Sequence, residues 1–394
     1  MEAFQNAIRQ EQVQSLLDTF LKETFQDTGE GVNRAVESLN NIFDLTASLA
    51  NLKPSQRKSR KQDNTDKWYD NDCKNLRTRL RNLSNQKHRE PDNENTRLQY
   101  SETLKQYKNT VRKKINQHTR NQLQHIEDSI KTNNFWENWN KLKQKQDELP
   151  IQDGDIWVNH FSKLFCPIEI NKAQKQIQDK LQNLESIIKN YQNPLDSPIT
   201  LNELQDKIKI LKPKKACGTD GILNEMIKHT DSKFQLAILK LLNTVLNSGT
   251  FPNIWNQGLL TQLHKSGDKF DPNNYRGICV NSNVGKLLCM IINQRILNFL
   301  TEKNILSKSQ IGFLPNYRTT DHIFTLNTLI DNQLNKNKSK MFSCFVDFKK
   351  AFDSIWHEGL LYKLLESGIG GKTYDTIKSM YTNTCAVRIG KKHT

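Results

Sequence analysis

The chain has 394 residues, of which 35% are hydrophobic, and a formal net charge of +16 at pH 7. This length allows roughly two or three domains. The charge suggests a polyanionic partner, most simply nucleic acid, and a solvated basic surface is the alternative. The seven cysteines form no CxxC pair, which argues against a disulfide framework, a disulfide-linked partner and a zinc knuckle. The scattered cysteines also predict a reducing compartment, and so an intracellular location in the nucleus or cytoplasm. The polar start and the lack of any apolar run near ~20 residues predict neither a secretory signal nor a membrane partner.

The first half of the chain has the pattern of helices. Residues 1–50 predict two helices broken at Gly29–Gly31, and residues 51–199 predict a basic, helical linker region. Within it, Trp68–Leu149 has the pattern of long, polar, strongly basic helices with few apolar positions. Lys53–Arg120 holds 19 Lys and Arg residues but only 8 Asp and Glu. The sparse apolar positions predict packing on one side, which leaves the Lys and Arg side chains to solvent or to phosphates, and both interpretations remain open.

Two apolar segments close this region, Trp136–Trp139 and Ile156–Phe165, and we expect both to dock as helices. From Thr200 onwards the composition changes, because residues 201–394 hold 13 of the 16 glycines. Thr200 and Glu203 predict a capping box that starts a helix at Leu201. A third division, residues 200–394, is therefore expected to form a compact domain.

Two strand-like segments follow, Leu259–Lys265 and Tyr275–Val280, joined by a polar hairpin. This pairing would place Lys265 and Arg276 near one end of a two-stranded ribbon. Enzymes that transfer phosphoryl groups use such cations to orient a triphosphate.

The segment Met341–Asp353 has the sequence MFSCFVDFKKAFD. Six uncharged residues precede Asp347, which predicts a buried strand that ends in a carboxylate. A metal-dependent site would place an acid there, although a buried strand that ends in a solvated Asp is the alternative.

Several motifs occur in an order that resembles the reverse transcriptase of non-long-terminal-repeat retrotransposons, the long interspersed element type. The resemblance covers residues 200–394 in detail and rests on KACGTDGI, LLTQLHKSGD, NNYRGICVNSNVGKLLCMIINQRI, QIGFLPNYRTTDHI and FVDFKKAFDSIWHEGLLYKLL. It implies an α+β right-hand polymerase with fingers and an incomplete palm, preceded by a largely helical basic N-terminal region. The implied reaction is RNA-directed DNA synthesis from an RNA template, a DNA primer and deoxynucleotide triphosphates with two Mg²⁺ ions.

The resemblance also assigns roles to individual residues. Asp347 matches the first metal-binding, catalytic carboxylate, and Phe352 matches the aromatic side chain that screens the sugar 2′-OH. Lys265 and Arg276 match contacts to the incoming triphosphate. The template-handling motif supplies four further positions: Gln310, Gly312, Phe313 and Arg318. Asp353 is expected to cap the next helix, Ile355–Glu366, together with Ser354 rather than to bind metal.

In the family, the next palm strands supply a Phe/Tyr-x-Asp-Asp turn, and this sequence contains no Asp-Asp pair. We therefore expect a fragment truncated within the palm that is inactive alone. Residues 1–50 are expected to form a helical segment, and whether it is the tail of a missing endonuclease stays open. A non-enzymatic RNA-binding protein that uses the basic helices and the fingers as a clamp is the alternative. A group II intron-type maturase shares the palm but not the linker.

Overall fold

The computed structural model describes residues 1–52, 68–129, 151, 153–165, 171–188, 193–336, 338–348, 350–353, 355–381, 384–389 and 392–393. The chain divides into two compact units, which are described separately. The first combines Met1–Pro54 with Leu149–Thr394, and the second is Ser55–Glu148. In the described residues, no helix is long and apolar enough to cross a membrane.

The N-terminal segment forms three helices rather than the two predicted: α1 (Glu2–Ile8), α2 (Glu11–Lys22) and α3 (Gly29–Leu49). The expected break at Gly29–Gly31 is the first turn of α3. Thr28 causes this start, because its hydroxyl accepts a hydrogen bond from the Gly31 N–H at 3.2 Å and so satisfies a free amide of the first turn.

Helices dominate the rest of the first unit. The predicted capping box is confirmed, since the Glu203 N–H donates to the Thr200 hydroxyl and the Thr200 N–H donates to the Glu203 carboxylate. The α-helices are α7 (Gly154–Phe165), α8 (Lys172–Ile188), α9 (Leu201–Ile210), α10 (Asn224–Lys228), α11 (Ser232–Ser248), α12 (Asn253–Asn256), α13 (Asn283–Glu302), α14 (Thr319–Asp331), α15 (His357–Glu366) and α16 (Gly371–Met380). Short helical turns lie at Pro194–Asp196, Pro272–Asn274 and Asn332–Lys336.

The described residues form one four-stranded sheet in the order β2-β1-β3-β4. Its strands are β1 (Gln257–His264), β2 (Tyr275–Val280), β3 (Thr384–Ile389) and β4 (Lys392–His393). β1 pairs antiparallel with β2 and parallel with β3, so it is a central strand with both edges occupied. The fold is therefore mostly helical with a small mixed sheet.

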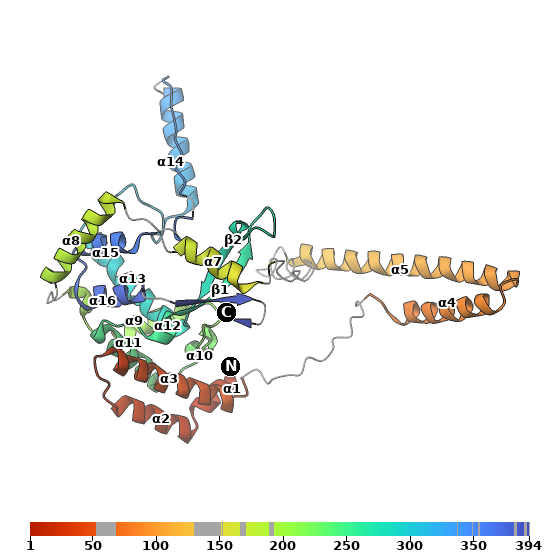
Figure 1. The fold of residues 1–394 in the computed structure, drawn as a ribbon, viewed down its shortest axis with the longest axis horizontal. Helices are drawn as coiled ribbons and strands as arrows, with labels where there is room; N and C mark the ends of the chain where they lie inside the picture. Colours follow the sequence, from red (N-terminus) through yellow and green to blue (C-terminus); the bar gives the residue numbers. More distant parts are fainter. Residues whose placement is uncertain are drawn as a thin grey trace. The chain divides into compact units, whose positions relative to one another are not determined.

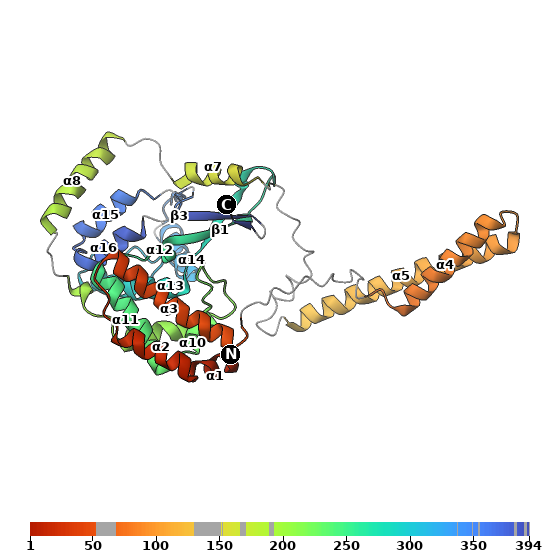
Figure 2. The same ribbon diagram turned by 60° about the horizontal axis from the view of Figure 1, so that its bottom comes forward.

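The main core joins the two chain segments that make up the first unit. Side chains from α1, α2 and α3 share one buried cluster with those of α9, α11 and α13, and Figures 1 and 2 show α2 and α3 beside α11. The rings of Phe43 in α3 and Phe234 in α11 lie 4.5 Å apart between centroids. The N-terminal helices are thus part of the same core as residues 199–292.

A smaller core attaches α7 to the sheet, which confirms the docking expected of Ile156–Phe165. Trp157 and Phe161 are buried against Leu260 of β1 and Tyr275 of β2. The Trp157 and Tyr275 rings meet edge to face at 4.8 Å. The other expected docking segment, Trp136–Trp139, lies outside the described residues.

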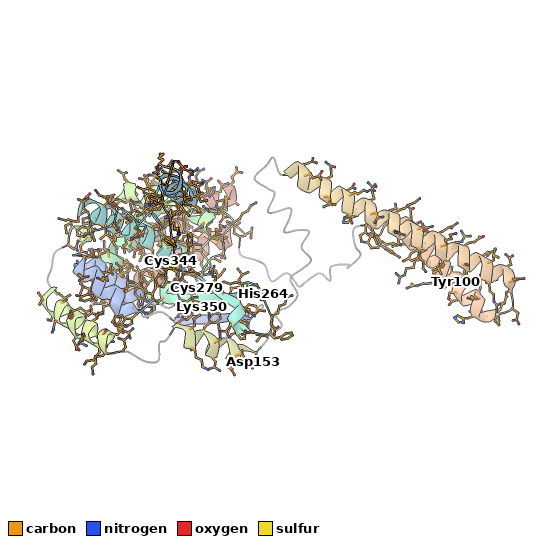
Figure 3. All side chains as sticks on the ribbon, turned by 90° about the horizontal axis from the view of Figure 1, so that it is seen from above. Tyr100, Asp153, His264, Cys279, Cys344 and Lys350 are labelled. Carbon is orange, nitrogen blue, oxygen red and sulfur yellow. The ribbon has the colours of Figure 1, made fainter. Side chains whose placement is uncertain are left out.

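The second unit contains the helical hairpin of α4 (Asn71–Arg89) and α5 (Glu94–Ser129). Two long helices therefore lie within the region predicted to be helical from Trp68, and they are separated between Glu90 and Asn93. Pro91 explains the interruption, because proline lacks an N–H and disfavours helical backbone at the preceding residue. Tyr100 of α5, labelled in Figure 3, lies beside α4, with Lys87 Nζ 5.0 Å from its ring centroid.

Candidate active site

The predicted two-stranded ribbon is confirmed by β1 and β2. Leu263 lies opposite Arg276 in the antiparallel register, and the Lys265 N–H donates to the Asn274 carbonyl at 2.9 Å just beyond β1. Since side chains alternate along a strand, Lys265 and Arg276 project from the same face of the ribbon. Both side chains are exposed. The opposite face packs on α7 through Leu260 and Tyr275.

The prediction of a buried strand before Asp347 is wrong. Residues 341–348 have no regular secondary structure, and Phe342 and Phe345 are 91% and 82% exposed. A strand needs neighbours for its backbone groups and burial for its side chains. Both edges of β1 are already occupied by β2 and β3, and none of the described strands pairs with this segment.

Asp347 is exposed at the end of that segment. The described residues contain no group of three or more His, Cys, Asp or Glu side chains that could hold a metal ion. Mg²⁺ prefers near-octahedral oxygen ligands and binds through carboxylates. The described residues therefore do not fit the two-metal site that the resemblance implies for a complete enzyme, of which the sequence was expected to supply only Asp347.

Asp353 does not cap the following helix as predicted. α15 begins after Trp356, its N-cap residue, without a side-chain cap. Asp353 instead belongs to a turn in which its N–H donates to the Lys350 carbonyl at 2.9 Å. Asp353 lies three positions before Trp356, so it does not occupy the N-cap position from which a side chain accepts from the free amides of α15. Ser354, its expected partner, lies outside the described residues.

The four residues of the predicted template motif lie on the loop before α14. Gln310 lines a groove of about 500 Å³ formed by this loop and the end of α13. Phe313 is 91% exposed with φ +63°, and a Cβ added at Gly312 would meet no atom within 4 Å. Arg318 is the N-cap residue of α14, and its N–H donates to the Asp321 carboxylate at 2.6 Å. The loop therefore presents open backbone and an exposed aromatic ring.

The structure brings two of the motifs into contact. Phe313 from the template motif and Phe352 from the segment after Asp347 meet edge to face, with ring centroids 5.6 Å apart and planes at 87°. Both residues are largely exposed, at 91% and 73%, and this edge-to-face geometry is one that aromatic pairs favour. The site thus contains an aromatic pair that links residues far apart in the sequence.

A basic pocket of about 560 Å³ lies beside the ribbon turn and was not predicted. It is lined by Lys350, labelled in Figure 3, by Asn273 before β2, and by His160 and Lys163 of α7. Burial, and then the charge of Lys350, lower the pKa of His160, so this ring is neutral at pH 7. The apolar spacing in this helix predicted packing only. It gave no indication that His160 and Lys163 would line a pocket.

Comparison with known proteins shows which family the C-terminal third of the chain resembles. Residues 263–394 match the family model for reverse transcriptase, the RNA-dependent DNA polymerases. All the predicted site residues fall within this range: Lys265, Arg276, Gln310, Gly312, Phe313, Arg318, Asp347 and Phe352.

The similar proteins come from mobile elements. The chain is 28% identical over 214 residues to the probable RNA-directed DNA polymerase from transposon BS of Drosophila melanogaster, covering 54% of this chain and 23% of that protein. It is 29% identical over 229 residues to the RNA-directed DNA polymerase from mobile element jockey of Drosophila funebris, covering 58% and 24%. The Pol polyprotein of the type-1 element R2 of Popillia japonica is 30% identical over 194 residues, covering 49% and 26%.

These matches confirm the resemblance to reverse transcriptases of non-long-terminal-repeat retrotransposons. The matched segments span about a quarter of the length of these curated relatives.

Proposed function

We propose that this chain provides nucleotide and template contacts of an RNA-directed DNA polymerase of the retrotransposon type. In this proposal residues 200–394 supply fingers and part of a palm, residues 51–199 a basic linker, and residues 1–50 a helical segment. Its partners are an RNA template, a DNA primer and deoxynucleotide triphosphates inside the cell. The observation that carries the proposal is the exposed pair Lys265 and Arg276 on one face of the β1–β2 ribbon.

The chemistry of the ribbon follows from its two cations. A triphosphate carries several negative charges close together, and two cations on one rigid face can fix its orientation for in-line attack. Arginine adds a planar fork that binds two phosphate oxygens at once. In the described part of the chain neither cation makes a salt bridge, so both charges remain available to a ligand.

Arg276→Ala should weaken binding of a deoxynucleotide triphosphate by roughly 10- to 100-fold, because charge-assisted hydrogen bonds contribute ~1.5–3 kcal/mol. The measurement is calorimetric titration of the full chain with dGTP. Lys269→Ala is the matched control, since Lys269 is an exposed cation in the same hairpin and lies beyond the end of β1. An equal loss in both variants would show that only general charge attracts the triphosphate.

The 394-residue polypeptide should not extend a DNA primer on an RNA template in the presence of Mg²⁺. One carboxylate, Asp347, cannot hold two ions against their hydration, and the sequence has no Asp-Asp pair. Primer extension followed on a gel tests this expectation. Template-dependent incorporation that disappears in Asp347→Ala would contradict it and would mean that other acids complete the site.

The alternative function, a non-enzymatic RNA clamp, is favoured by the basic α4–α5 hairpin. It does not require the triphosphate contacts. Normal binding of dGTP by Arg276→Ala, together with strong RNA binding, would support this alternative over a polymerase.

A further inference from the structure

The α4–α5 hairpin carries its positive charges in an ordered way. On α4, Lys74, Arg77 and Arg81 are exposed and follow the i, i+3, i+7 spacing that places side chains on one helix face. On α5, four exposed cations fall within roughly 80° of arc at about 100° per residue: Arg97, Lys105, Lys108 and Arg112. Each helix therefore has one basic stripe.

The contacts between the helices fix their register. Lys114 of α5 bonds Asp70 and Asp72 at the start of α4, at 2.5 and 3.2 Å. The hydroxyl groups of Tyr69 and Tyr107 lie 3.4 Å apart, and hydrogen bonds to these two tyrosines raise the pKa of Arg77. Arg77 is thus level with the turn of α5 that contains Lys108. One turn away in each direction, Lys74 is level with Arg112, and Arg81 with Lys105.

The two stripes lie on the same side of the hairpin. The helices meet along a seam that includes Cys73 and Leu83 of α4 and Thr103 of α5. Both stripes are rotated from this seam in the direction of increasing residue number. Because the helices run antiparallel and both are right-handed, equal rotations in that direction lead to the same side of the pair. We call the seven cations together the basic face: Lys74, Arg77, Arg81, Arg97, Lys105, Lys108 and Arg112.

Acidic side chains are kept off this face. Within residues 74–81 and 97–112 the single acid is Glu102, which the same helical geometry places on the other side. Among the described residues of the hairpin, the ion pairs given by the structure involve Lys114 and not the basic face. Its charge is therefore not neutralised within the hairpin.

We propose that the basic face binds the phosphate backbone of RNA without reading its sequence. The row of cations from Arg97 to Arg112 is roughly 22 Å long at about 1.5 Å per residue, and its length suits several successive phosphates. The described residues that line the face are Lys and Arg with few aromatic side chains, which favours backbone contact over base stacking. The choice of RNA rests on the proposed function, whereas the charge pattern does not.

The test neutralises one side of the hairpin at a time in the full chain. The face variant carries Lys74→Gln, Arg81→Gln, Lys108→Gln and Arg112→Gln. Arg77 is left in place because it bonds Tyr69 and Tyr107. The control variant removes four exposed cations that point elsewhere: Arg79→Gln, Arg89→Gln, Lys113→Gln and Arg120→Gln. Both change the net charge equally, and glutamine keeps nearly the helix propensity of Lys and Arg.

Binding of a single-stranded RNA of unrelated sequence is measured by fluorescence anisotropy over a range of salt concentrations. The face variant should reduce the slope of log K against log salt by about 3, since each lost phosphate contact contributes ~0.7. The control variant should reduce it by less than 1. Equal reductions in the two variants, or a polyglutamate that binds as tightly as the RNA, would overturn the proposal.

Titration of the face variant with dGTP separates this proposal from the proposed function. Normal dGTP binding with lost RNA binding supports the basic face. Normal RNA binding by the face variant rejects the basic face, whatever the result with dGTP. Loss of dGTP binding in Arg276→Ala remains the separate measure of the polymerase proposal.

Discussion

Replacing Phe234 by Ala should lower the free energy of unfolding of the first unit by about 4 kcal/mol, the usual cost of removing a fully buried aromatic ring. Phe234 is fully buried and its ring packs against that of Phe43, with 4.5 Å between centroids and planes tilted by 51°. The substitution leaves a cavity where α3 meets α11. This is a large part of the ~5–15 kcal/mol by which a typical domain is stable.

Urea unfolding followed by tryptophan fluorescence measures this loss, because Trp157 and Trp255 are buried in the first unit. Leu236→Ala is the control in the same helix, since Leu236 is 43% exposed, and it should cost below ~1 kcal/mol. Similar midpoints for wild type and Phe234→Ala would mean that the N-terminal helices contribute little to the core.

Arg295→Met should cost about 3 kcal/mol, toward the lower end of the range for breaking a buried ion pair. Arg295 of α13 donates to both oxygens of Glu203, at 2.7 and 2.9 Å, and to the carbonyls of Leu195, Ser197 and Pro198. Its side chain is 12% exposed and that of Glu203 32% exposed, so solvent screens the pair in part. Methionine fills much of the space but donates nothing, so the three carbonyls lose this donor and Glu203 keeps only its bonds to Thr200.

The same pair makes stability depend on pH. The hydrogen bond from Arg295, with the amide and hydroxyl of Thr200, lowers the pKa of Glu203 from 4.5 to about 2 against the opposing effect of burial. The stabilisation is therefore fully present above pH 4.5 and is lost as the pH falls toward 2. The difference in stability between wild type and Arg295→Met should narrow over that range. Urea unfolding at several pH values tests this, and a constant difference would contradict the role of Glu203.

Local signals in the sequence located many elements correctly. The capping box at Thr200 and Glu203 depends on residues three apart, and β2 occupies the predicted Tyr275–Val280. The ribbon could also be predicted, because its two strands are near neighbours in the sequence, and such strands commonly pair. These features are determined by neighbours in the chain, so a single sequence contains enough information to find them.

Features that depend on distant residues could not be predicted in this way. The shared core of Phe43 and Phe234, the contacts of Arg295 and the aromatic pair of Phe313 and Phe352 all join separate motifs. The segment before Asp347 shows the opposite case, a strand that was predicted and is not formed. Its apolar run satisfied the pattern of a strand, but pattern alone does not supply the neighbouring strand that would hold it. The assigned roles of the site residues stay predictions.

The parallel pairing of β1 with β3 has a consequence for synthesis on the ribosome. β1 and β2 are close in sequence and can pair as soon as both emerge, whereas Gln257 of β1 meets Thr384 of β3. At about 5–20 residues per second, the intervening chain takes roughly 6–25 s to be made. During that interval the backbone N–H and C=O groups on the second edge of β1 have no partner strand. The nascent sheet therefore has an unpaired edge that another chain could bind. The time during which this edge is open to aggregation is therefore set by the speed of translation.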